Sequence, residues 1–142
     1  MRAVADNNIV VCGLLWHGSS RQLLSAAREG KVELFTSGAL LAELEDVLRR
    51  KKFLKRLADA QLEPRELVTG YAALATVVQP GPIVPVVLRD PDDDAVIACA
   101  VAAAATSIVS GDGDLLALKQ YQEIEIVRVA EFITRLGQGR FS

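Results

Sequence analysis

The most informative segment of this sequence is Thr106-Ser107-Ile108-Val109-Ser110-Gly111-Asp112-Gly113-Asp114, in which an apolar stretch runs directly into two aspartates. Its first four residues predict a β-strand over 106–109. The same pattern opens the chain, where a predicted strand over 2–5 stops at Asp6. In open parallel sheets, functional sites form beyond the carboxyl ends of the strands, at the point where the strand order reverses. We therefore expect the acids that follow these two strands to meet in space.

Helical stretches alternate with predicted strands along the chain. Strands are expected over residues 2–5, 32–35, 84–88, 106–109 and 124–127. Helices are expected over residues 19–28 and from residue 36 or 37 to about residue 50. A pair of helices is expected to follow, the first through residue 57 and the second across residue 66 to residue 76. Further helices are expected over residues 90–105, 115–119 and 129–136. This alternation is typical of βαβ units with right-handed crossovers. The predicted fold class is α/β, a three-layer α/β/α sandwich around a mostly parallel sheet of four or five strands.

The composition indicates one globular domain over residues 1–142. Of the 142 residues, 51% are hydrophobic and 24% are charged, which is ordinary for a globular chain. With 18 acidic and 16 basic residues, the net charge is −2. That balance argues against an architectural nucleic-acid binder, which would carry a large positive excess, but it allows a nuclease.

Cysteine usage and hydropathy predict a cytoplasmic protein without a membrane segment. Cys12 and Cys99 are too few for a disulfide framework, so a reduced compartment is expected. Asp6 interrupts the N-terminus where a signal peptide would need an apolar stretch. The longest apolar run, residues 95–105, is shorter than the roughly 18 residues that span a bilayer.

Four aspartates crowd the start of the helix expected over 90–105, in the segment Asp90-Pro91-Asp92-Asp93-Asp94. Aspartates at a helix start cap free N–H groups and complement the helix dipole, but one or two would suffice for that. Asp93 heads a line of residues expected to pack on the sheet, namely Ile97, Ala100, Val101 and Ala104. We therefore favour a metal-ligand role for Asp93 and helix capping for Asp90, Asp92 and Asp94.

Carboxylates that face inward together are unfavourable unless they are protonated or neutralised by a cation. Oxygen ligands without histidine or cysteine suit Mg²⁺ or Mn²⁺ rather than zinc. Such ions support phosphodiester hydrolysis because they lower the pKa of a water molecule and shield the charge on the phosphate. The single histidine, His17, is expected at the surface, and the sequence contains no Gly-rich phosphate loop.

A basic run stands within residues 49–56, with no acid among its members: Arg49, Arg50, Lys51, Lys52, Lys55 and Arg56. The rest of the chain has 10 basic and 18 acidic residues, a balance near −8. A solvated helix end explains such a run about as well as contact with a phosphate backbone. Beside an acidic metal centre the second interpretation gains weight, so these six residues are candidate RNA contacts.

Four acidic segments occur in a recognisable order and spacing. The first, Val4-Ala5-Asp6-Asn7-Asn8, ends a strand, and the second, residues 36–44, carries Glu43 on a predicted helix. The third is residues 89–93, and the fourth is residues 109–116. Together these segments resemble the PIN-domain family, over nearly the full length of the chain. The helical wheel alone favours Glu43 and Glu45 equally, whereas the resemblance maps the second acid to Glu43.

The resemblance implies an acidic quartet, an accessory carboxylate and two supporting residues. The quartet is Asp6, Glu43, Asp93 and Asp112, the accessory carboxylate is Asp114, and Asn8 and Ser110 position ligands or water by hydrogen bonds. The chain departs from the family's pattern at Asn7, where Thr or Ser is usual, and at Ser110, where Thr is usual.

The same resemblance implies a metal-dependent endoribonuclease that uses one or two Mg²⁺ or Mn²⁺ ions. Many short PIN chains are toxins of toxin–antitoxin pairs, each inhibited by a small antitoxin that occupies the groove. The resemblance also implies a homodimer or a higher homo-oligomer.

Two other functions remain open at this point. A catalytically silent PIN-like module that binds RNA or acts as a scaffold is favoured only by Asn7 and the modest net charge. A small-molecule phosphatase or a phosphorelay receiver would use a similar sheet. A receiver needs an acceptor aspartate after its third strand and a lysine after its fifth, and Arg89-Asp90 and Arg128 match these positions poorly.

Overall fold

The sheet and its helices are seen in a computed structural model that describes residues 1–81 and 91–137. Strands and helices alternate through these ranges, as the sequence predicts. In chain order they are β1 (Arg2–Ala5), α1 (Asn7–Leu15), α2 (Ser19–Arg28), β2 (Glu33–Ser37), α3 (Gly38–Leu48), α4 (Lys51–Asp59), α5 (Pro64–Leu74), β3 (Thr76–Val78), α6 (Pro91–Ala102), β4 (Ser107–Val109), α7 (Gly113–Leu118), β5 (Gln120–Tyr121), β6 (Ile124–Val127) and α8 (Val129–Gly137). The strand predicted over 84–88 lies outside the described residues.

The described strands form one sheet in the order β3-β2-β1-β4-β6-β5. All neighbouring strands are parallel except β5 and β6, which are antiparallel. The prediction of four or five strands was therefore wrong, because the described sheet has six. The two strands that the sequence missed, β3 and β5, are three and two residues long and lie at the edges of the sheet. Such short, largely exposed segments carry no clear alternation of apolar and polar residues.

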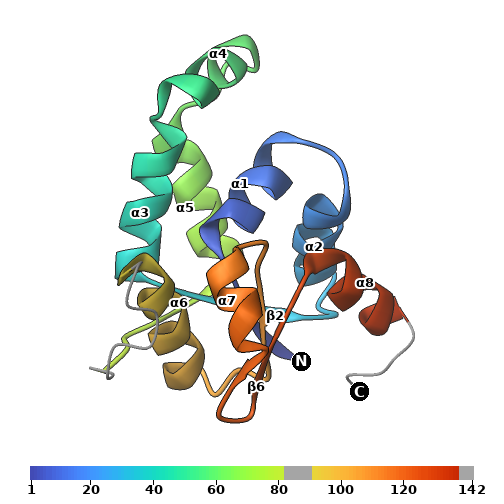
Figure 1. The fold of residues 1–142 in the computed structure, drawn as a ribbon. Helices are drawn as coiled ribbons and strands as arrows, with labels where there is room; N and C mark the ends of the chain where they lie inside the picture. Colours follow the sequence, from blue (N-terminus) through green and yellow to red (C-terminus); the bar gives the residue numbers. More distant parts are fainter. Residues whose placement is uncertain (82–90, 138–142) are drawn as a thin grey trace.

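Helices cover both faces of the sheet, as the three-layer prediction requires. Alternate residues of β1 point to opposite faces, so Ala3 and Ala5 pack in one core and Val4 packs in the other. The first core is closed by α1, α2, α3, α5 and α8, and the second is closed mainly by α6 and α7. Figure 1 shows α3, α4 and α5 as an arm that extends from the sheet, with α4 at its tip.

Local sequence signals explain several helix ends. The Ser37 hydroxyl caps α3 by accepting a hydrogen bond from the Leu40 N–H, and Pro64 occupies the first turn of α5. Gly30 adopts a positive φ of 77° just after α2, a conformation that suits glycine at a helix end. The helix α2 begins at Ser19, and its N-cap residue is Gly18, so no side chain caps it.

The buried face of α6 differs slightly from the one that the sequence suggests. Ile97 and Ala100 are fully buried, as expected, but Val101 is 39% exposed. Asp93 lies on the buried face, one turn before Ile97, and is only 5% exposed. No helix within residues 1–81 and 91–137 has the length and apolar character needed to cross a membrane.

Candidate metal centre

The candidate site lies where the strand order of the sheet reverses. From β1 the chain proceeds to β2 and β3 on one side, and it later returns to place β4 on the other side of β1. Asp6 directly follows β1, and Asp112 follows β4 after a two-residue connection. The Asp6 N–H donates to the Val109 carbonyl at 2.9 Å, so the two strand ends are joined at the level of the acids.

Asp6 is a buried carboxylate held by hydrogen bonds. It is 6% exposed, and its Oδ2 accepts a hydrogen bond from the Ser110 hydroxyl at 2.9 Å. Burial raises the pKa of Asp6 above its ordinary value, since the charged form loses hydration. The hydrogen bond from Ser110 lowers that pKa, whereas the neighbouring Asp112 carboxylate raises it. In the absence of a cation, ionised Asp6 is thus disfavoured by its surroundings.

The Ser110 hydroxyl links the two strand ends, because it donates one hydrogen bond and accepts another. While donating to Asp6, Ser110 Oγ accepts a hydrogen bond from the Asp112 N–H at 3.0 Å. Asp112 in turn caps α7, because its Oδ2 accepts from the Leu115 N–H at 3.2 Å. One carboxylate oxygen of Asp112 is therefore engaged by the helix, and the loop between β4 and α7 has a fixed conformation.

Three aspartates bring carboxylate oxygens close together beside this loop. One oxygen from each of Asp93, Asp112 and Asp114 lies within 4.8 Å of the others. The three side chains differ in exposure: Asp93 is buried, Asp112 is half-buried and Asp114 is exposed. The helix α6 thus contributes its inward-facing acid to the same edge of the sheet as the acids after β4.

A cavity of about 160 Å³ joins these acids to the remaining predicted residues. It is lined by Asp6, Asn8, Glu43, Val47, Arg50, Asp93 and Asp112. Glu43, on α3, therefore faces the other acids of the cavity. Glu45 instead forms an ion pair with Arg49, with 3.7 Å between Glu45 Oε2 and Arg49 Nε. The structure separates these two glutamates, which the helical wheel favours equally.

The basic run does not form one continuous surface. The helix α3 ends at Leu48 and α4 begins at Lys51, so the run spans a break between two helices. Arg50 lines the acidic cavity, whereas Lys52, Lys55 and Arg56 line a separate cavity of about 530 Å³ near the end of α1. Sequence reasoning placed Arg50 among six equivalent cations and missed its position beside the carboxylates.

A family model matches most of the chain. The family model of the PIN domain covers residues 2–114, a range that contains all five predicted acidic ligands. The chain belongs to the PIN-domain family. Proteins of this family are typically nucleases. A search of curated proteins finds no match.

A solved structure shares the fold of this PIN domain. It is the crystal structure of VapBC2 from Rickettsia felis bound to a DNA fragment from their promoter. The superposed chain is 16% identical, with a TM-score of 0.58, and the match covers 89% of the present chain and 97% of that chain. At this identity the likeness concerns the fold.

The residues of this PIN domain fit a hard divalent cation. All the candidate ligands are carboxylates, and three of them already present oxygens within 4.8 Å of one another. Mg²⁺ and Mn²⁺ prefer oxygen ligands and offset the repulsion between clustered carboxylates. Asp93, Asp112 and Asp114 would hold such an ion, with Asp6 and Glu43 on the adjoining wall of the cavity.

Asn7, where the sequence departs from the family's usual Thr or Ser, has a structural contact. Its side chain is 2% exposed and donates a hydrogen bond through Nδ2 to the Leu40 carbonyl at 2.9 Å. This bond fixes the start of α1 against α3, the helix that carries Glu43. Asn7 therefore holds the two walls of the cavity together.

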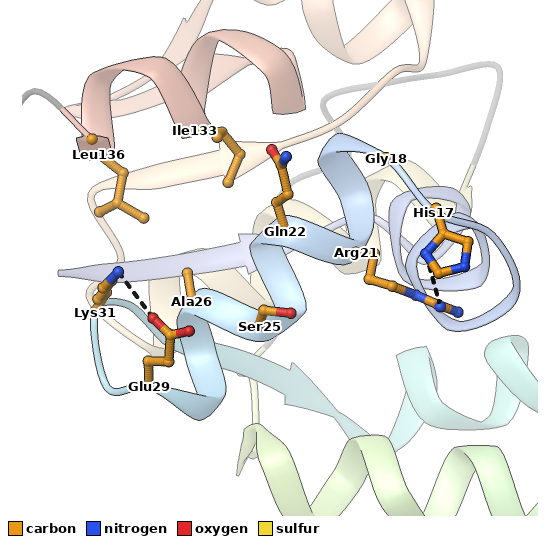
Figure 2. A pocket seen from close by; sticks show the side chains of 11 residues that line it. His17, Gly18, Arg21, Gln22, Ser25, Ala26, Glu29, Lys31, Ile133 and Leu136 are labelled. Atoms are coloured by element: carbon orange, nitrogen blue, oxygen red, sulfur yellow. Dashed lines mark hydrogen bonds and ion pairs between the residues drawn. The ribbon is translucent and has the colours of Figure 1, made fainter.

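The histidine lies in another, larger cavity between α2 and α8. Its volume is about 680 Å³. Figure 2 shows Ile133 and Leu136 on one side of it and the side chains of α2 on the other. His17 is exposed at its edge, where Nδ1 lies 3.4 Å from the Arg21 guanidinium. This position agrees with the prediction of a surface histidine.

Proposed function

We propose that this PIN domain is a divalent-metal-dependent endoribonuclease that hydrolyses phosphodiester bonds in RNA. The observation that carries the proposal is the approach of the Asp93, Asp112 and Asp114 carboxylates within 4.8 Å at the end of β4. Membership of a family that is typically nucleolytic supports hydrolysis of phosphodiesters.

The proposed roles are those that the resemblance to the family implies, and the positions of the side chains in the cavity support them. Asp6, Glu43, Asp93 and Asp112 form the catalytic quartet, and Asp114 is a further ligand for one or two Mg²⁺ or Mn²⁺ ions. When bound, such an ion lowers the pKa of a water molecule and offsets charge on the phosphate. Ser110 holds Asp6 by its hydrogen bond, and Asn8 lies at the cavity wall, where its amide can orient substrate or water.

We further propose that the protein is the toxin of a toxin–antitoxin pair that acts in the cytoplasm. The similar solved structure is described as VapBC2 bound to promoter DNA, and its fold supports this assignment by analogy. A small antitoxin would then be its protein partner, and the toxin would form a homodimer or a higher homo-oligomer. Size-exclusion chromatography with light scattering measures the oligomer directly.

Cleavage of RNA tests the proposed activity. The purified protein is incubated with a mixed RNA pool in Mn²⁺, in Mg²⁺ and in EDTA, alongside the Asp93→Asn variant. We expect cleavage that needs the metal and is abolished in Asp93→Asn, while circular dichroism shows that the variant remains folded.

Two results would count against the proposal. Cleavage by Asp93→Asn at the parental rate would show that the acidic quartet is wrongly assigned. No cleavage by the folded parent, together with tight RNA binding and no stabilisation by Mn²⁺, would favour a silent RNA-binding or scaffold module.

A further inference from the structure

Among the described residues that line the acidic cavity, one side chain is positively charged. Arg50 shares this cavity with Asp6, Glu43, Asp93 and Asp112. It reaches this position because the chain turns between α3 and α4, where Arg50 is the extended N-cap residue with φ −66° and ψ 145°. A continuous helix through the basic run would have placed Arg50 differently relative to its neighbours.

Arg50 differs from the other arginines of the basic run in its contacts. Arg49 pairs with Glu45, and Arg56 donates to the Leu15 carbonyl and lies over the Trp16 ring at 4.9 Å. Among the residues that the structure describes, no hydrogen bond or ion pair engages the Arg50 guanidinium. Its donors are thus available to a ligand in the cavity.

An RNA phosphate that enters a cavity lined by carboxylates meets repulsion from each ionised group. A neighbouring guanidinium offsets this repulsion and can donate two parallel hydrogen bonds to phosphate oxygens. We propose that Arg50 binds an RNA phosphate at the acidic cavity, which makes it a phosphate-binding residue of the site. The inference rests on the proposed function, since it names the group that brings the substrate to the carboxylates.

A purely structural function for Arg50 leads to different expectations. If Arg50 served only to offset repulsion between the carboxylates, its removal would lower the stability of the metal-free protein and leave RNA affinity unchanged. If it binds phosphate, removal lowers RNA affinity even without metal, because the contact is made by the guanidinium itself. RNA binding in EDTA therefore separates the two functions.

The experiment measures fluorescence anisotropy of a labelled single-stranded RNA of mixed sequence in EDTA. The proteins are the parent, Arg50→Gln, Arg49→Gln and the control Arg65→Gln, which removes an exposed arginine of α5. For Arg50→Gln we expect the dissociation constant to rise roughly tenfold to a hundredfold, the usual loss for a hydrogen bond between charged groups. The dissociation constant should rise much less in Arg49→Gln, and it should be unchanged in Arg65→Gln.

The salt dependence and a conservative variant add two independent readouts. Loss of one phosphate contact should lower the slope of log affinity against log salt by about 0.7 in Arg50→Gln. Arg50→Lys, which keeps the charge but not the planar pair of donors, should recover part of the affinity. Mn²⁺ affinity, measured by titration calorimetry, should not fall in Arg50→Gln.

Failure of this inference is distinguishable from failure of the proposed function. Equal losses in Arg50→Gln and Arg65→Gln, unchanged binding in Arg50→Gln, or a parent that does not bind RNA in EDTA would each overturn the assignment of Arg50. A parent that binds RNA through Arg50 but does not cleave it in Mn²⁺ would leave the assignment intact and refute the nuclease. A parent that cleaves RNA while Arg50→Gln binds and cleaves equally well would refute the assignment of Arg50 and leave the proposed nuclease activity intact.

Discussion

Replacing Ser110 with alanine tests the hydrogen-bond arrangement at the strand ends. Ser110 is fully buried, and its hydroxyl donates to the Asp6 carboxylate at 2.9 Å while accepting from the Asp112 N–H at 3.0 Å. A hydrogen bond to a charged group contributes about 1.5–3 kcal/mol to stability, and one between neutral groups contributes about 1 kcal/mol. We therefore expect Ser110→Ala to lower the free energy of unfolding by about 3 kcal/mol at pH 7.

The matched control is Ser107→Ala on β4. Ser107 is also fully buried, but its hydroxyl has no hydrogen-bond partner among the described residues. Removing that hydroxyl leaves no partner unsatisfied, so the stability of Ser107→Ala should be equal to or above that of the parent. Both variants remove the same atom from the same region of the core, and only one of them breaks the contact with Asp6.

Urea unfolding followed by circular dichroism, in EDTA at pH 7 and at pH 4, measures the effect. The Ser110 hydrogen bond lowers the pKa of Asp6, so the bond favours the ionised form. The loss caused by Ser110→Ala should therefore be larger at pH 7 than at pH 4. Equal stability of Ser110→Ala and Ser107→Ala, or a loss that does not depend on pH, would refute this reasoning.

Three further predictions concern stability without metal. Burial raises the pKa of Asp6 above its unfolded value of 3.8. Ionisation of Asp6 therefore lowers the free energy of unfolding as the pH rises through the raised pKa, and this loss of stability is absent below pH 3.8. Asp6→Asn should thus gain stability relative to the parent at pH 7 in EDTA, and a gain that persists unchanged at pH 3 would contradict the stated cause. Asn7→Ala should lose about 1–3 kcal/mol in urea unfolding by removing the bond from α1 to α3, and parental stability would show that this bond is dispensable. Arg56→Gln should lose about 1 kcal/mol because Arg56 donates to the Leu15 carbonyl at the end of α1, whereas Lys55→Gln should lose less, and the opposite order would be inconsistent with this contact.

The positions of the aspartates were predictable because they follow from strand boundaries. Asp6 and Asp112 come after short apolar segments, and parallel strands bring their carboxyl ends to one edge of the sheet. Asp93 was predictable from helix periodicity, since Ile97 and Ala100 share its buried face. These patterns depend only on local sequence.

Other features depend on contacts that the sequence does not encode locally. Glu43 and Glu45 flank the same apolar stripe, so only the packing of α3 against the sheet brings Glu43 to the cavity. The edge strands β3 and β5 are too short for a periodic signal, which is why six strands were found where four or five were expected. The break between α3 and α4, which directs Arg50 to the acids, has no proline or glycine to mark it.

The central claim is that the clustered carboxylates form one divalent-metal site. Titration calorimetry of Mn²⁺ into the metal-free protein tests it most directly, with Asp93→Asn and Asp114→Asn measured in parallel. Because Asp93 and Asp114 present oxygens to a common point with Asp112, we predict one or two ions per chain for the parent and clearly weaker binding for both variants. A folded parent that binds no Mn²⁺, or variants that bind it as tightly as the parent, would contradict the claim.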